Sequence, residues 1–211
     1  MREESSREPP GQHSIWYDYF HALYRVSHAI NSNLHVPEVL TIMAEKITEA
    51  MQAKACSLRL LDKRTGTLTI SAEYGLSEAY LHKGPVQVEH SPLDQEVLRG
   101  NSVYIANAAE DARFQYREQA RREGIVSVFC VPLIVHGETI GVLRVYSGQP
   151  RTFSEAEQEF LGVLASVAAL AVENARLYQA LKRDYEETMD ALWGVPWQDA
   201  SRAESPSVLN D

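Results

Sequence analysis

The chain has 211 residues, of which 45% are hydrophobic and 23% are charged, and its formal net charge at pH 7 is -9. This length predicts one domain with flanking segments, and the composition is that of a globular protein rather than a disordered or fibrous one. The negative charge argues against a nucleic-acid partner, because phosphate groups are bound by clustered lysine and arginine.

No stretch is typical of a targeting or membrane segment. The longest apolar run, Val163 to Val172, is shorter than the roughly 20 residues that cross a bilayer. The first residues, MREESSREPPGQH, lack the hydrophobic part of a signal peptide, so we expect a cytoplasmic protein without a membrane partner. In that reducing compartment we expect Cys56 and Cys130, which lie in apolar runs, to be buried thiols rather than a disulfide.

The N-terminal part predicts an arm followed by two helices. Residues 1–13 mix charge, proline and glycine without periodicity, which is typical of a disordered arm. Residues 14–36 predict a helix whose narrow apolar stripe is typical of a helix pair; the stripe consists of Trp16, Phe20, Leu23, Ser27, Ile30 and Leu34. After a turn with Pro37 near the next helix start, EVLTIMAEKITEAMQA predicts a helix with one core-facing side.

Two alternating segments then predict a β-hairpin. CSLRLLD places Ser57, Arg59 and Leu61 on one face and its other apolar residues, including Cys56, on the opposite face. KRTG provides a turn, and LTISAEYG repeats the alternation.

The pattern loosens between residues 76 and 122. We expect a short strand at 85–88, a short helix at 93–98, a strand at 103–105, and a helix in AEDARFQYREQARREG with Asp111 as its cap. The arginines that recur in that last helix, Arg113, Arg117 and Arg121, are most simply a solvated helix face. A long polar insertion of this kind predicts where a binding function resides.

The C-terminal part predicts a second hairpin and a long helix. The strands are SVFCVPLIV and TIGVLRVYS, joined by HGE. Ser154 and Glu157 form a capping box that opens a helix reaching Trp193, with residues 181–193 as its extension and 194–211 as a flexible tail. The helix is apolar on two sides, so we expect the sheet to cover one side and another helix to cover the other.

The order of these elements resembles the GAF domain, a ligand-sensing module of signalling proteins. The resemblance covers roughly residues 22–180, and its motifs are CSLRLLD, TGTLTISAEYGL, the helix closing at Arg99 and Gly100, the segment DARFQYREQARREGIVSVFCVPLIVHGETIGVLRVYS, and RTFSEAEQEFLGVLASVAALAVENARLY. It implies an α+β fold with a six-stranded antiparallel sheet. The terminal helices would lie on one face, and a small-molecule pocket under short helices on the other.

Two arginines give the sharpest site hypothesis. If the first strand lies beside the last, as the resemblance implies, Arg59 and Arg144 both face the pocket and offer planar forks to an anion. The alternative is that they pair with Glu73, Glu89 or Asp94, or extend to solvent. The other candidate pocket residues are Ser71, His90, Ser91, Asp94, Tyr104, Phe129 and Tyr146.

No catalytic or metal-binding constellation is recognisable, and the sequence identifies no cofactor. The similar family includes a free methionine sulfoxide reductase that uses cysteines of its pocket loops, but the segment from Leu81 to Gly124 contains none. We expect Cys130 to pack beneath the terminal helices as an inert thiol. A haem site would rest on His90 alone, and bilin attachment lacks its pocket cysteine.

The predicted function is that of a non-catalytic, dimeric sensory module, which passes the state of a small-molecule ligand through its terminal helices to a signalling partner. The candidate dimer residues are Trp16, Phe20, Leu23, Ile30, Leu164, Ala168, Ala171, Ala175 and Tyr178. The alternatives are a ligand-free scaffold for dimerisation or docking, for which Trp193 and Trp197 offer an aromatic motif, and a redox enzyme like the sulfoxide reductase.

Overall fold

A computed structural model describes residues 12–31 and 36–193, with side chains for residues 17–28 and 36–189. The helix expected from residue 14 begins at Gln12, and the rest of the predicted arm lies outside the described residues. The tail at 194–211 and the side chains of Trp16, Ile30 and Trp193 lie outside them as well.

Six strands form one antiparallel sheet, as the resemblance implied, and their order is β3-β2-β1-β6-β5-β4. The strands are β1 (Ala55–Asp62), β2 (Thr67–Tyr74), β3 (Val86–Gln87), β4 (Val103–Ile105), β5 (Ser127–Val135) and β6 (Glu138–Ser147). The helices are α1 (Gln12–Asn31), α2 (Val36–Ala50), α3 (Glu78–Leu81), the 3-10 helix η1 (Val88–His90), α4 (Pro92–Leu98), α5 (Arg117–Glu123) and α6 (Glu155–Trp193).

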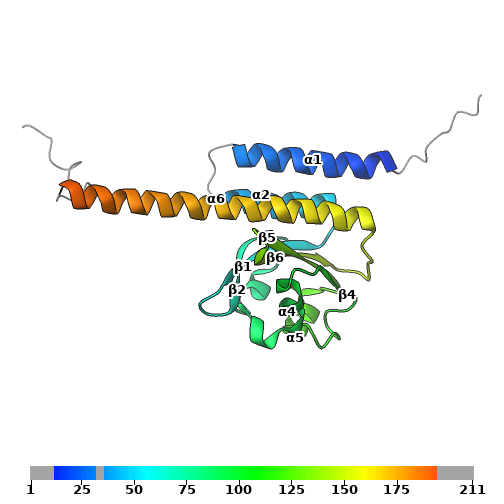
Figure 1. Cartoon of the computed structure of the whole chain (residues 1–211). Coiled ribbons are helices and arrows are strands. Elements are labelled where there is room, and N and C mark those ends of the chain that lie inside the picture. The colour runs from blue at the N-terminus through cyan, green and yellow to red at the C-terminus, as the bar shows by residue number, and fades with distance from the viewer. Residues whose placement is uncertain (1–11, 32–35, 194–211) are drawn as a thin grey trace, which may run out of the picture. The chain divides into compact units, whose positions relative to one another are not determined.

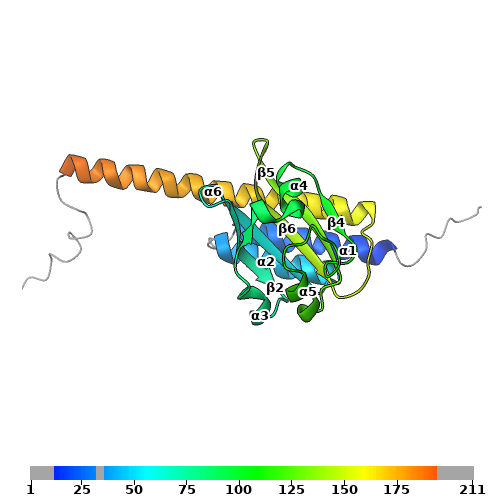
Figure 2. The same cartoon turned by 90° about the horizontal axis from the view of Figure 1, so that it is seen from below.

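The chain divides after Ala171 into two units, and the second contains only the continuation of α6 among its described residues. In the first unit, α2 and the start of α6 cover one face of the sheet, while α4 and α5 cover the other (Figure 1). Figure 2 shows α3, α4 and α5 in front of the strands. We call residues 76–126, apart from β3 and β4, the lid.

Helix α1 forms an outer layer on the helical face. It packs on α2. Its Tyr19 stacks on Phe160 of α6, with ring centroids 4.2 Å apart. Helix α1 therefore contacts both α2 and the start of α6.

The predicted capping box opens α6. The Ser154 backbone N–H donates to the Glu157 carboxylate over 2.7 Å, and the Glu157 N–H donates to Ser154 Oγ over 3.3 Å. These two bonds satisfy backbone donors that a helix start leaves unpaired.

The helix expected around Asp111 is shorter than predicted. It comprises only Arg117–Glu123 and ends at Gly124, whose φ of 72° is left-handed. The Asp111 carboxylate accepts from the Arg113 backbone N–H at 2.9 Å and forms a turn instead of capping this helix. A side chain that bonds to the backbone two residues later competes with helix formation.

Gly141 allows β6 to lie close to β1. A Cβ at this position would lie 2.2 Å from the Arg59 carbonyl oxygen. Only glycine avoids this clash with the backbone of β1.

Helix α6 is also long and apolar enough to cross a membrane over Glu155–Met189, with a mean hydropathy of 1.5. One such helix is weak support for a membrane span, because the core helix of a globular domain has the same character. Leu161 and Leu164 of α6 are buried in the first unit.

Candidate functional site

Arg59 and Arg144 share the lid face of the sheet. Strand β1 pairs with β6, so that Arg59 lies opposite Val142, and Arg144 lies opposite Ser57. Directly opposed residues point to the same face, and successive residues alternate. Val142 belongs to the hydrophobic cluster between sheet and lid, which places both arginines on that side.

Arg144 is neutralised by the lid. Its guanidinium forms a buried ion pair with the Asp94 carboxylate of α4, which also accepts a 2.6 Å hydrogen bond from Ser91. Burial lowers the pKa of Arg144, but the charge of Asp94, together with its hydrogen bond and the neighbouring Cys130 and Tyr146, outweighs burial and raises that pKa well above its usual value. The pairing alternative is therefore confirmed for Arg144 with Asp94, one of the three expected carboxylates.

Arg59 has no such partner. Its side chain is fully buried, and its Nε, Nη1 and Nη2 atoms hydrogen-bond to no described residue. Neither Glu73 nor Glu89 forms an ion pair with it among the described residues. An uncompensated buried charge costs on the order of several kcal/mol, so the Arg59 guanidinium is suited to a bound anion.

A third cation, Lys83, belongs to the lid itself, and the sequence did not predict it as a site residue. Its Nζ is buried without a hydrogen-bond partner in the described chain and lies 4.2 Å from the centroid of the Tyr80 ring. Burial, followed by the charges of Arg59 and Arg144, lowers the pKa of Lys83 to about 7. The sequence around it, HKGP, shows no alternation of apolar and polar residues, so the burial of the Lys83 amine is seen only in the structure.

The lid face also holds Tyr146. Its hydroxyl shares a 3.0 Å hydrogen bond with Ser57, and its ring meets Tyr80 edge-on at 6.3 Å. Of the remaining candidates, Ser91 is buried beside Asp94, Ser71 is half-buried in β2, and His90 is exposed in η1.

Two predicted pocket residues lie on the wrong face for the site. Phe129 is opposite Val145 and stacks on Phe153, the residue shortly before α6, at 5.0 Å. Tyr104 is paired with Phe129 and its hydroxyl donates to the Arg151 carbonyl at 2.7 Å. Both side chains therefore pack on the helical face, which corrects their assignment as pocket residues.

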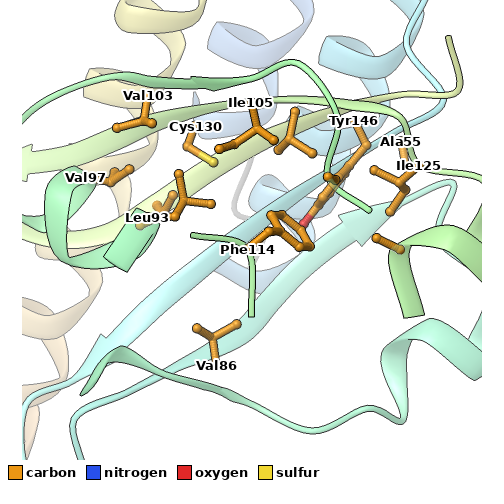
Figure 3. Packing of buried hydrophobic residues seen from close by; sticks show 14 of the residues in the cluster. Ala55, Val86, Leu93, Val97, Val103, Ile105, Phe114, Ile125, Cys130 and Tyr146 are labelled. Atoms are coloured by element: carbon orange, nitrogen blue, oxygen red, sulfur yellow. The ribbon is translucent and has the colours of Figure 1, made fainter. Parts of the chain in front are cut away.

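The reverse correction applies to Cys130. It lies opposite Arg144, and Figure 3 shows it on the lid side with Val97 and Val103. The expectation that Cys130 packs beneath the terminal helices is thus wrong, although the thiol is buried as expected. Burial, only partly offset by Arg144, raises the pKa of Cys130 to about 12, which disfavours the reactive thiolate.

Apolar side chains pack between sheet and lid around these charges. Leu93, Ile105, Phe114 and Tyr146 belong to one buried cluster (Figure 3). Side chains of this cluster thus lie where the resemblance implied a small-molecule pocket under short helices. Within the described residues, no group of three His, Cys, Asp or Glu side chains could hold a metal ion.

An apolar groove of about 610 Å³ lies between α1 and α6 on the helical side. It is lined in part by Phe20, which is 74% exposed, by half-buried Leu23, and by Val163, which is 50% exposed. By contrast, Leu164 and Ala168 are buried within the domain, so they cannot contact a second subunit as predicted. The remaining candidates on α6 are half-buried or exposed: Ala171, Ala175 and Tyr178.

Comparisons with known proteins agree on the fold. The model of the GAF domain matches residues 33–173. The chain is 25% identical over 178 residues to the formate hydrogenlyase transcriptional activator of Salmonella typhimurium, covering 82% of this chain and 26% of that protein. It is 28% identical over 163 residues to the methyl sulfide methyltransferase-associated sensor of Methanosarcina acetivorans, covering 75% and 16%.

A solved structure shows the same architecture. The GAF domain of a phosphoenolpyruvate-protein phosphotransferase from Acinetobacter superposes with a TM-score of 0.64 at 28% identity, covering 75% of this chain and 94% of that one. The match to nearly all of that domain contrasts with the small fraction of the two curated relatives that this chain spans.

Proposed function

The chain belongs to the GAF domain family, and on this basis we propose that it is a non-catalytic regulatory module of the cytoplasm that senses a small anion beneath its lid. The two relatives described above carry the names of an activator and a sensor. Their names place this domain type in signalling proteins, which supports a sensory role.

The observation that carries the proposal is the unpartnered Arg59 guanidinium. It is fully buried on the lid face, beside an arginine whose charge is already balanced by Asp94. A carboxylate, nitrate or phosphate group would supply the missing acceptors, since a guanidinium fork matches such groups in two hydrogen bonds.

The anion can act as a signal if it binds one lid arrangement better than another. Asp94 of α4 already connects the lid to β6 through Arg144, so lid and sheet are coupled by charge. We propose that the terminal helices relay the lid state to a signalling partner.

We also propose that a second copy of the chain covers the groove between α1 and α6. The groove exposes the apolar side chains of Phe20 and Val163. Two turns further along α6, Leu170 is also apolar and 59% exposed. Apolar stripes on helices favour burial against another helix.

Native mass spectrometry of the full chain, purified from its own cells, tests the proposed function. We expect the wild type to retain a small anionic molecule, and Arg59→Met to lose it while remaining folded. Equal retention by both proteins would contradict the role of Arg59. A wild type that retains no molecule, and that binds neither nitrate nor sulfate when these are added, would contradict the anion sensor itself and favour the scaffold.

A further inference from the structure

Lys83 lies in the lid, on the loop between α3 and β3, and faces the same buried region as Arg59. Its Nζ lies between two tyrosine rings, 4.2 Å from the centroid of Tyr80 and 5.1 Å from that of Tyr116. The Tyr116 ring is fixed in turn, because its hydroxyl donates to the Pro85 carbonyl over 2.8 Å. The aromatic faces hold the amine in place but offer it no hydrogen-bond acceptor.

The groups that face Lys83 come from four helices and strands and from the segment before α5. They are Arg59 of β1, Arg144 of β6, Asp94 of α4, and the tyrosines Tyr80 of α3 and Tyr116 before α5. The adjacent His82 is exposed and bonds to the Glu78 carbonyl at 2.7 Å. Among the charged groups, only Asp94 is negative, and Arg144 already occupies it.

The charges of these groups indicate which net charge a ligand should carry. The Arg144 and Asp94 charges cancel, which leaves Arg59 on the sheet and the protonated form of Lys83 on the lid. The Arg59 guanidinium and the Lys83 Nζ atom are buried and lack hydrogen-bond acceptors within the described residues. We propose that Lys83 is a specificity-determining residue that binds the second negative charge of the ligand, so that the site takes a small dianion bridging Arg59 and Lys83. This inference rests on the anion site proposed above.

The bridge would connect the ligand to the lid. The single charge of a monoanion is balanced by Arg59 alone, so Lys83 does not bind it. A dianion binds both Arg59 and Lys83, and this attraction holds the lid against the sheet. The dianion therefore binds the closed lid better than the open one, which is the unequal binding that a signal requires. Near neutral pH, its charge also draws a proton onto the Lys83 amine.

Titration calorimetry with sulfate and nitrate at constant ionic strength tests the inference, because sulfate stays a dianion and nitrate a monoanion in this pH range. We expect the full-length wild type to prefer sulfate. Its affinity for sulfate should fall about tenfold between about pH 6 and pH 8, as one proton must be taken up per ligand. Nitrate affinity should change little.

Lys83→Met keeps an apolar chain against the tyrosine rings and removes the charge. We expect it to bind sulfate and nitrate alike, without the pH dependence, while Lys63→Met, at an exposed ion pair with Glu138, behaves as the wild type. A Lys83→Met protein that keeps the sulfate preference would overturn the inference alone, whereas an Arg59→Met protein that keeps all anion binding would overturn the proposed function.

A second measurement does not depend on the variant folding. Wild-type sulfate binding at about pH 8, measured in buffers of different ionisation enthalpy, should show uptake of nearly one proton. No proton uptake, or no sulfate binding at all, would overturn the dianion assignment.

Discussion

Arg144 of β6 and Asp94 of α4 form a buried ion pair that joins the sheet to the lid. Arg59, on the same sheet face, has no such partner among the residues that the structure describes. The charge of Arg144 is thus balanced within the closed structure, whereas the Arg59 guanidinium finds no hydrogen-bond acceptor among the described residues.

Replacing Arg59 should stabilise the ligand-free protein. Arg59→Met removes an uncompensated buried charge and retains apolar bulk, so we expect the free energy of unfolding to rise by about 1–4 kcal/mol in urea denaturation. Arg59→Lys, which keeps a positive charge, is the control and should not be stabilised. Loss of stability in Arg59→Met would mean that the guanidinium is already compensated.

Breaking the ion pair should have the opposite effect. Asp94→Asn leaves the Arg144 charge buried without a carboxylate, and we expect the free energy of unfolding to fall by about 3–5 kcal/mol. Adding Arg144→Met to this variant should restore much of the loss, because the stranded charge is gone. If the two substitutions are additive in a double-mutant cycle, the residues are not coupled as the structure indicates.

Lys83 should make stability depend on pH. The pKa of Lys83 in the folded chain, about 7, lies below that of an exposed lysine in the unfolded chain, about 10.4. Between these values the unfolded chain binds more protons, so this group makes the free energy of unfolding rise with pH. Denaturant titrations at several pH values should show this rise in the wild type and in Lys63→Met. The rise should be smaller in Lys83→Met; equal slopes in all three proteins would argue against a buried amine.

The helical groove should mediate self-association. We expect the double substitution Phe20→Glu and Val163→Glu to convert a wild-type dimer to a monomer in sedimentation velocity, since charges would face the partner's apolar surface. Ile134→Glu, at a residue 41% exposed on β5, is the matched control and should remain dimeric. A wild type that is monomeric at all concentrations would contradict self-association through this groove.

Local alternation and capping predicted the strands and the long capped helix, whereas the arrangement of the sheet, and with it the lid-facing arginines, followed from the resemblance to the GAF domain. The sequence could not assign the faces of β5, where Phe129 and Cys130 are both buried. A strand covered on both sides has no polar alternation to mark its faces, and only its register with β6 shows that Cys130 shares the face of Arg144.

The same ambiguity affected α6. The helix is apolar on two sides, and the sequence does not show which side faces the sheet. The sequence analysis assigned Leu164 to the dimer interface, although Leu164 is buried and Val163 is exposed. Lys83 was missed because it lies in an irregular loop. Its burial depends on Tyr80 and Tyr116, which reach it from separate parts of the lid.

Diffraction from crystals of the full chain soaked in selenate, a dianion with a strong anomalous signal, tests the central claim most directly. We predict an anomalous peak within hydrogen-bond distance of the Arg59 guanidinium, between the sheet and the lid, which is absent from Arg59→Met crystals soaked in the same way. Selenate bound at the surface while the Arg59 guanidinium remains without it, or a peak that persists in Arg59→Met, would contradict an anion site beneath the lid.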